Sequence, residues 1–107
     1  MTDIEQQAVR EFAAKARELL GERLLGLKLF GSKARGDDTP ESDIDVLVEV
    51  DQATAAIEDT VLDIAFAVNL AHDVYISPRV IERAVFEHPV WSITPFIRSV
   101  VEQGVPL

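Results

Sequence analysis

The sequence predicts an α/β (α+β) fold in which a small mixed sheet of three strands is backed by helices. Its apolar patterns give the order helix, strand, strand, helix, strand, helix, helix. The loop between the first two strands is too short for a long crossover helix, so the sheet is expected to be mixed. A length of 107 residues, with 48% hydrophobic and 27% charged residues, fits one globular core. Residues 1–107 are therefore expected to form a single domain.

The first half of the chain contains one amphipathic segment and two strand-like runs. Residues 3–20 carry apolar side chains at three- and four-residue spacing, which predicts a helix that Gly21 can end. Residues 24–30 form a short apolar run, and residues 44–50 (IDVLVEV) are rich in β-branched side chains, so both predict strands. Residues 37–41 (DDTPE) are polar and contain a proline without an amide donor, so a loop is expected there.

The second half is expected to hold three helices and the third strand. A helix should begin at a cap on Asp51 or Thr54. Its apolar face, at helical spacing, comprises Ile57, Val61, Ile64, Ala65 and Val68. Residues 73–76 (DVYI) predict the third strand. The Ser-Pro pair at 77–78 and the Thr-Pro pair at 94–95 are typical of helix starts, which predicts a short helix over about 77–85 and a last helix that ends at Gly104.

Composition excludes several classes of protein. The chain has no cysteine, so it can form neither a disulfide nor a thiolate metal site. No apolar run approaches the ~20 residues needed to cross a bilayer, and the polar N-terminus is unlike a signal peptide, so a cytoplasmic protein is expected. A formal net charge of −9 argues against direct nucleic-acid binding, which needs a basic surface. The acidic excess fits a metal site or a basic protein partner, and it can equally serve solubility.

Residues 31–36 (GSKARG) form the first candidate site. Gly31 and Ser32 stand where a strand should end and a helical turn should begin. Glycine allows a phosphate to approach the backbone, and the amides of such a turn, with the Ser32 hydroxyl, can donate to phosphate oxygens. Lys33 and Arg35 bring positive charge to the same turn. By itself a Gly-Ser pair carries no specificity, because it occurs in many turns.

Asp43 and Asp45 form the second candidate site. They lie two residues apart at the start of a strand, so their side chains point to the same face of the sheet. Two neighbouring carboxylates in an apolar strand repel each other, and a divalent cation relieves that repulsion. Oxygen ligands suit Mg²⁺, which commonly takes one or two carboxylates together with substrate phosphates and water. Taken alone, the pair is better explained by a turn cap and a solvated edge residue.

The two sites together are far more specific. A strand, Gly31-Ser32, a loop of about ten residues and then Asp43-Ile44-Asp45 on the next strand resemble the signature of the DNA polymerase β-like nucleotidyltransferase superfamily. The full string from Gly31 to Val46 is similar to its minimal nucleotidyltransferase (MNT) branch, and the likeness extends over essentially the whole chain.

The resemblance implies a nucleotidyltransferase fold and transfer of AMP from ATP with Mg²⁺, two ions in the usual arrangement. It implies that Asp43 and Asp45 hold the metal and that a third carboxylate comes from a later strand. Asp73, at the start of the predicted strand 73–76, is the candidate for that ligand and for accepting the hydroxyl proton. Gly31 and Ser32 would cradle the phosphates, with Arg35, or Lys33 in second place, offsetting the charge of the leaving pyrophosphate.

The acceptor implied by the resemblance is a protein. Small MNT proteins are similar to antitoxins that neutralise a helical HEPN-type ribonuclease toxin, either by transferring AMP to a toxin tyrosine or by binding the toxin. A non-catalytic binding antitoxin and an aminoglycoside-type small-molecule nucleotidyltransferase therefore stay open as alternatives. The apolar residues Val90, Trp91, Ile93 and Phe96 fit either a partner surface or core packing, and core packing is the expectation.

Overall fold

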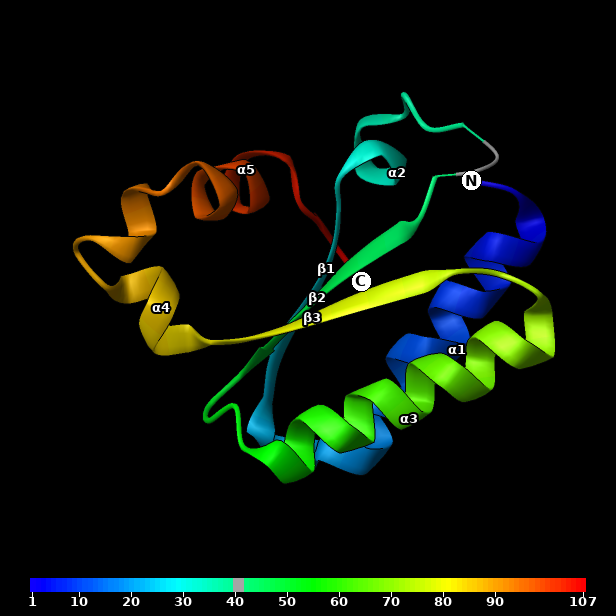
Figure 1. The fold of residues 1–107 in the computed structure, drawn as a ribbon, viewed down its shortest axis with the longest axis horizontal. Helices are drawn as coiled ribbons and strands as arrows, with labels where there is room; N and C mark the ends of the chain where they lie inside the picture. The colour runs from blue at the N-terminus through cyan, green and yellow to red at the C-terminus, as the bar shows by residue number, and fades with distance from the viewer. Residues whose placement is uncertain (40–41) are drawn as a thin grey trace.

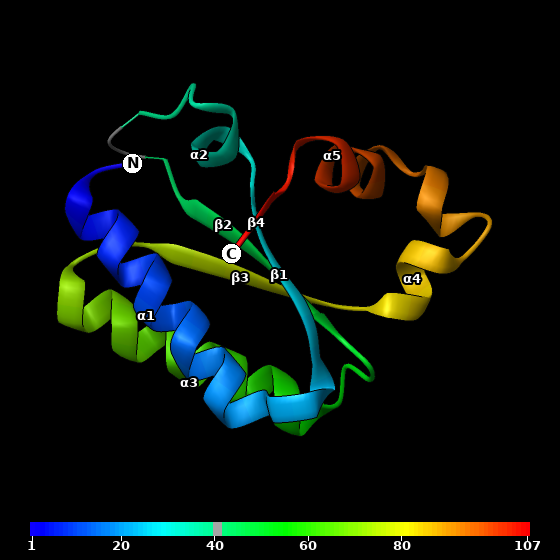
Figure 2. The same ribbon diagram turned by 180° about the vertical axis from the view of Figure 1, so that it is seen from behind.

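The sheet at the centre of the molecule is mixed, as predicted. The structure, a computed structural model, describes residues 1–39 and 42–107. Within them the sheet has four strands in the order β3-β2-β1-β4, of which β4 is labelled in the reverse view (Figures 1 and 2). The strands are β1 (Leu24–Phe30), β2 (Ile44–Val50), β3 (Ile76–Glu82) and β4 (Val105–Pro106). β1 is antiparallel to β2 and to β4, whereas β2 and β3 are parallel. The fourth strand escaped prediction because its two residues are too few to show a pattern.

Two long helices cover one face of the sheet and bury the main core. They are α1 (Asp3–Leu20) and α3 (Ala55–His72), which lie side by side in Figure 2. Thr2 caps α1 in a reciprocal arrangement with Glu5, and Thr54 caps α3 by accepting a hydrogen bond from the Ile57 amide. The predicted apolar face of α3 is buried here, together with Val46 and Val48 of β2.

The opposite face of the sheet is covered only in part. Leu47 of β2 is buried on this side, because alternation turns it away from Val46 and Val48. Ile97 and Val100 of α5 (Pro95–Gln103) are also buried but do not belong to the main core. The short helix α4 (Arg83–Glu87) and the 3₁₀ helix η2 (Trp91–Ile93) complete this layer (Figure 1). Both the start of α5 after Thr94 and its end at Gly104 agree with the sequence prediction.

Three predictions about residues 73–85 are wrong. Residues 73–75 are not a strand, since β3 begins at Ile76, and the Ser-Pro pair at 77–78 lies inside β3 rather than at a helix start. Proline is tolerated there because β3 is an edge strand, where a missing N–H need not cost a ladder hydrogen bond. Tertiary pairing with β2 over seven residues outweighs the local helix signal. The helix predicted over 77–85 is reduced to α4.

The remaining short elements lie at the ends of β1. The 3₁₀ helix η1 (Gly21–Arg23) precedes β1, and α2 (Ser32–Arg35) follows it. The loop predicted at 37–41 lies in part outside the described residues. No helix among the described residues combines the length and the apolarity that spanning a bilayer demands.

Candidate active site

Gly31 brings the end of β1 against a carboxylate of β2. The antiparallel register places Phe30 opposite Asp45, so the next residue passes directly beside the Asp45 side chain. Gly31 has φ of 75°, and a Cβ built there would lie 2.4 Å from Asp45 Oδ2. Both the positive φ and the close approach require glycine. The two motifs found separately in the sequence are therefore parts of one site.

Asp43 and Asp45 form an electrostatically strained pair. Asp43 is exposed just before β2, and Asp45 is partly buried in the strand. Burial raises the pKa of Asp45 above its ordinary value, and repulsion from the charge of Asp43 raises that pKa further. The positive charges of Arg79 and Arg35 oppose both effects. The ionised pair therefore gains stability from any additional cation at this end of the sheet.

These carboxylates fit a divalent metal ion. Hard oxygen ligands suit Mg²⁺, which needs only one or two protein carboxylates when substrate phosphates and water supply the rest. The raised pKa of Asp45 is the physical sign of that fit, because a bound cation would favour the charged form that the protein alone disfavours.

The turn after Gly31 holds two of the predicted phosphate ligands. Ser32 is partly exposed at the start of α2, and Gly36 leaves the turn with φ of 81°. Arg35 is exposed, and its Nε donates to Asp37 Oδ2 at 3.2 Å. An exposed ion pair of this kind is weak, so Arg35 can exchange Asp37 for a phosphate.

Lys33 lies in the same turn but points away into a buried ion pair. Its Nζ is 2.9 Å from Glu5 Oε2 and 3.0 Å from Asp38 Oδ2, and the residue is only 6% exposed. The hydrogen bond with Glu5 is the main reason that the pKa of Lys33 is raised. Lys33 therefore ties the turn to the start of α1, and this placement does not support its predicted contact with phosphate.

The structure does not bring Asp73 to the other two carboxylates. Asp73 ends α3 in the left-handed conformation with φ of 52°, and it is exposed. Its predicted position on a strand is wrong, because β3 starts three residues later. Among residues 1–39 and 42–107, no group of three carboxylate or histidine side chains could hold a metal ion together. His72, the residue before Asp73, pairs with Glu11 of α1.

The strand next to the aspartates presents residues that the sequence prediction missed. Ser77 is the β3 partner of Asp45, and Arg79 lies two residues further along. The guanidinium of Arg79 lies over the ring of Phe96, 4.7 Å from its centroid. Phe96 in turn packs edge-to-face on Phe30, with ring centroids 5.6 Å apart. The sequence analysis missed Ser77 and Arg79 because it predicted a helix over 77–85, and only the observed pairing of β3 with β2 places Arg79 near Asp45.

Comparison with known proteins identifies the family. Residues 9–105 match the nucleotidyltransferase domain. A protein of Methanocaldococcus jannaschii, provisionally named a protein adenylyltransferase, is 36% identical over 101 residues, which is 94% of each chain. A second protein of that organism with the same provisional name is 33% identical over 100 residues, covering 92% of this chain and 94% of its own.

Solved structures agree on the fold. A protein provisionally described as a minimal nucleotidyltransferase aligns with a TM-score of 0.58 at 20% identity, covering 99% of this chain and 97% of the other. The MntA-HpeT toxin-antitoxin, in a mutant form, aligns with a TM-score of 0.55 at 22% identity, covering 96% of this chain and 70% of the other. The fold, the joined Gly31 and Asp45 motifs and the family match all agree with the resemblance seen in the sequence. The chain belongs to the nucleotidyltransferase domain family and is a nucleotidyltransferase.

Proposed function

We propose that this protein is a Mg²⁺-dependent protein adenylyltransferase that moves AMP from ATP to a tyrosine hydroxyl of a HEPN-type toxin and so neutralises it. The observation that carries the catalytic part is the contact between Gly31 and Asp45. Gly31 lies directly beside Asp45, which supports a single site in which the turn binds phosphate and the carboxylate pair binds metal.

Each part of the site has a distinct task in this reaction. The acceptor hydroxyl oxygen forms a bond to the α-phosphorus of ATP, and the bond from that phosphorus to the bridging oxygen breaks. Pyrophosphate leaves with the electron pair, and the hydroxyl proton is released to solvent. Asp43 and Asp45 would hold Mg²⁺, which supplies charge stabilisation for the attacking and leaving oxygens. The Gly31 and Ser32 turn and Arg35 bind the phosphate oxygens.

Two surface features favour a protein as the acceptor. Leu62, Phe66 and Leu70 are exposed at four-residue spacing on α3, and they line an open hollow of about 730 Å³ together with Tyr75. Val90, Trp91 and Ile93 are also exposed, so the expectation that they pack in the core is wrong; only Phe96 packs against the sheet. Large exposed apolar patches are typical of protein–protein contacts. The two relatives from Methanocaldococcus jannaschii, both provisionally named protein adenylyltransferases, also favour a protein acceptor.

The experiment is to purify the chain together with the helical protein encoded beside its gene and to add Mg²⁺ and ATP. Intact mass spectrometry then weighs both proteins before and after the reaction. The proposal expects the partner to gain the mass of one or more AMP units at a tyrosine, which peptide sequencing locates.

The matched control is the Asp43→Asn, Asp45→Asn double variant, which should leave the partner unmodified. A stable complex without any change in mass would instead support a binding antitoxin. No complex and no modification would contradict the protein acceptor, and aminoglycosides would be the next substrates to test.

A further inference from the structure

Arg79 of β3 lies on the face of the sheet that carries the aspartate pair. The parallel register pairs Ser77 with Asp45 and Arg79 with Leu47. Arg79 is therefore two residues along β3 from the partner of Asp45, with its side chain on the same face of the sheet. Arg79 is also the largest influence that lowers the pKa of Asp45, ahead of Arg35. Register and electrostatics therefore agree that this guanidinium lies close to the site.

Phe96 holds the Arg79 side chain in place. Its ring lies 4.7 Å from the guanidinium carbon, and the ring is itself fixed by its edge-to-face contact with Phe30. Arginine stacks well on aromatic faces while leaving its N–H donors at the rim free to bind other groups. Because Phe30 is the β1 partner of Asp45, this aromatic pair connects Arg79 with the centre of the site.

Among the described residues, Arg79 differs from the other cations near the aspartates because no anionic side chain pairs with it. Lys33 is paired with Glu5 and Asp38, and Arg35 is paired with Asp37. Within the part of the chain that the structure describes, the guanidinium of Arg79 makes no ion pair and no hydrogen bond to another side chain. Its five N–H donors are thus available to a ligand, and planar bidentate donors match phosphate oxygens.

We propose that Arg79, positioned by Phe96, binds the triphosphate of the nucleotide and so replaces Lys33 as the second cation of the site beside Arg35. The inference rests on the proposed nucleotidyl transfer and adds a binding residue from β3. In this arrangement β3, the strand beside the aspartates, contributes a cation to the site. The phosphates of the nucleotide lie between Arg79 and the Gly31 turn.

Two opposing effects of Arg79 make the proposal testable. Its positive charge repels a bare divalent cation at Asp43 and Asp45, yet it attracts the anionic complex of the metal with ATP. Removal of the side chain should therefore weaken binding of Mg²⁺-ATP while leaving binding of the metal alone unchanged or stronger. A residue that only maintains the shape of the site would affect both ligands in the same direction.

The test measures both affinities for the wild type and for Arg79→Ala, Arg79→Lys and Phe96→Leu. Calorimetry with Mg²⁺-ATP gives the first affinity, and electron paramagnetic resonance of free Mn²⁺ gives the second. Arg79→Ala is expected to lose about tenfold or more in Mg²⁺-ATP affinity without losing Mn²⁺ affinity. Arg79→Lys should keep part of the nucleotide affinity, because the charge remains but the paired donors are lost. Phe96→Leu should fall between the wild type and Arg79→Ala.

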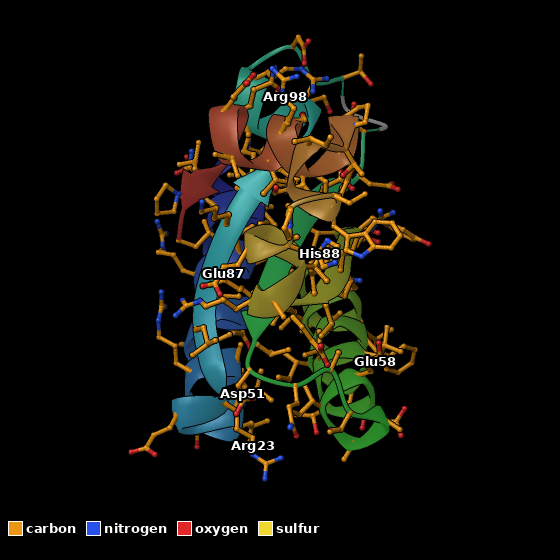
Figure 3. The ribbon with its side chains drawn as sticks, turned by 90° about the vertical axis from the view of Figure 1, so that its left-hand side faces the viewer. Arg23, Asp51, Glu58, Glu87, His88 and Arg98 are labelled. Atoms are coloured by element: carbon orange, nitrogen blue, oxygen red, sulfur yellow. The ribbon has the colours of Figure 1, made fainter. Side chains whose placement is uncertain are left out.

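Arg23→Ala is the matched control. Arg23 is an exposed arginine just before β1, and Figure 3 shows it near Asp51. The register pairs Leu24 with Val50, at the opposite end of β1 from the partner of Asp45. The Arg23→Ala substitution removes the same charge as Arg79→Ala and should change neither the Mg²⁺-ATP affinity nor the Mn²⁺ affinity. Circular dichroism verifies that each variant is folded.

Two results would overturn the inference while leaving the proposed function intact. One is a folded Arg79→Ala protein whose Mg²⁺-ATP affinity stays within twofold of the wild type. The other is a parallel loss of Mn²⁺ and Mg²⁺-ATP binding, which would make Arg79 a structural residue. A wild-type protein that binds no Mg²⁺-ATP would overturn both the inference and the proposed function.

Discussion

At the scale of single residues, the site depends on one position without a side chain. The methyl group of an alanine at 31 would occupy the space of an Asp45 oxygen, at 2.4 Å from it. Gly36 offers a matched comparison, because its φ is also positive, at 81°, yet a Cβ there would meet nothing within 4 Å. Backbone strain is thus common to both glycines, whereas the clash with the carboxylate belongs to Gly31 alone.

Gly31→Ala should therefore abolish Mg²⁺-ATP binding, and Gly36→Ala should retain it. Gly36→Ala should lose about 1–2 kcal/mol of stability, because alanine is strained in the left-handed conformation. Gly31→Ala should lose more, because the clash with Asp45 adds to the strain of its positive φ. Thermal unfolding and nucleotide calorimetry on the pair separate the two effects. Equal nucleotide affinity in the two variants would show that Gly31 serves only the turn.

Asp45 gives a prediction about pH. Its folded-state pKa is raised, so the folded protein holds the Asp45 proton more tightly than the unfolded chain does. The free energy of unfolding therefore decreases as pH rises from the ordinary aspartate range through the raised pKa, and the destabilisation is complete above it. In the presence of EDTA, Asp45→Asn should melt at a higher temperature than the wild type at pH 7, and the difference should vanish below the ordinary aspartate pKa.

Added Mg²⁺ should make the melting temperature of the wild type higher than that of Asp45→Asn. The metal binds the folded wild type and stabilises it by mass action, whereas Asp45→Asn has lost one carboxylate ligand and binds the metal more weakly. A wild type that is more stable than Asp45→Asn at neutral pH without metal would contradict the electrostatic strain described for the pair.

Residue chemistry explains why the sequence predicts a phosphate contact for Lys33 and none for Arg79. Lys33 stands in the motif itself, so its charge suggested a phosphate contact, but its partners Glu5 and Asp38 become neighbours only in the folded chain. Arg79 stands outside the motif, and only the pairing of β3 with β2 brings it near Asp45. Local patterns identify residues with the required chemistry, and tertiary contacts decide which of them remain free to use it.

At the scale of elements, prediction succeeded where a long pattern and a cap agree. The helix α3 has a regular apolar face, and it begins at Thr54, one of the two caps expected. Prediction failed at β3, where seven residues carry a helix-start signal at Ser77-Pro78 and only the pairing with β2 decides the outcome. The placement of Asp73 failed with it, because that residue was expected to begin the strand and instead ends α3.

The cap of α3 provides a test at this scale. The Thr54 hydroxyl accepts a hydrogen bond from the Ile57 amide at 3.2 Å, so Thr54→Ala should lower the free energy of unfolding by about 1 kcal/mol. Thr60→Ala is the control, because the Thr60 hydroxyl bonds only to the Ala56 carbonyl within the same helix. Urea unfolding of both variants measures the difference. Equal stability would show that Thr54 contributes nothing as a cap.

At the scale of the whole molecule, the fold separates stability from function. One face of the sheet packs on α1 and α3 and holds the main core, whereas the candidate site lies at the end of the other face, between α2 and α5 (Figure 1). The sequence predicts both strands because they are apolar runs, and it predicts the fold class from the order of the elements and the short loop between the first two strands.

The exposed apolar surfaces are also a property of the whole molecule. Phe66 and Leu70 of α3 are 71% and 75% exposed, although their spacing is as regular as that of the buried face. A sequence pattern cannot distinguish an apolar helix face that packs on the sheet of its own chain from one that stays exposed. The same ambiguity led to the incorrect placement of Trp91 in the core.

The most direct test of the account is calorimetric titration of Mg²⁺-ATP into the wild type and into the folded Asp43→Asn, Asp45→Asn double variant. The wild type is expected to bind Mg²⁺-ATP and to lose that binding when EDTA is added, whereas the double variant is expected not to bind. The double variant should also melt at a temperature at least as high as the metal-free wild type, because the repulsion between the carboxylates is gone. Unchanged Mg²⁺-ATP affinity in the folded double variant would contradict the assignment of the site.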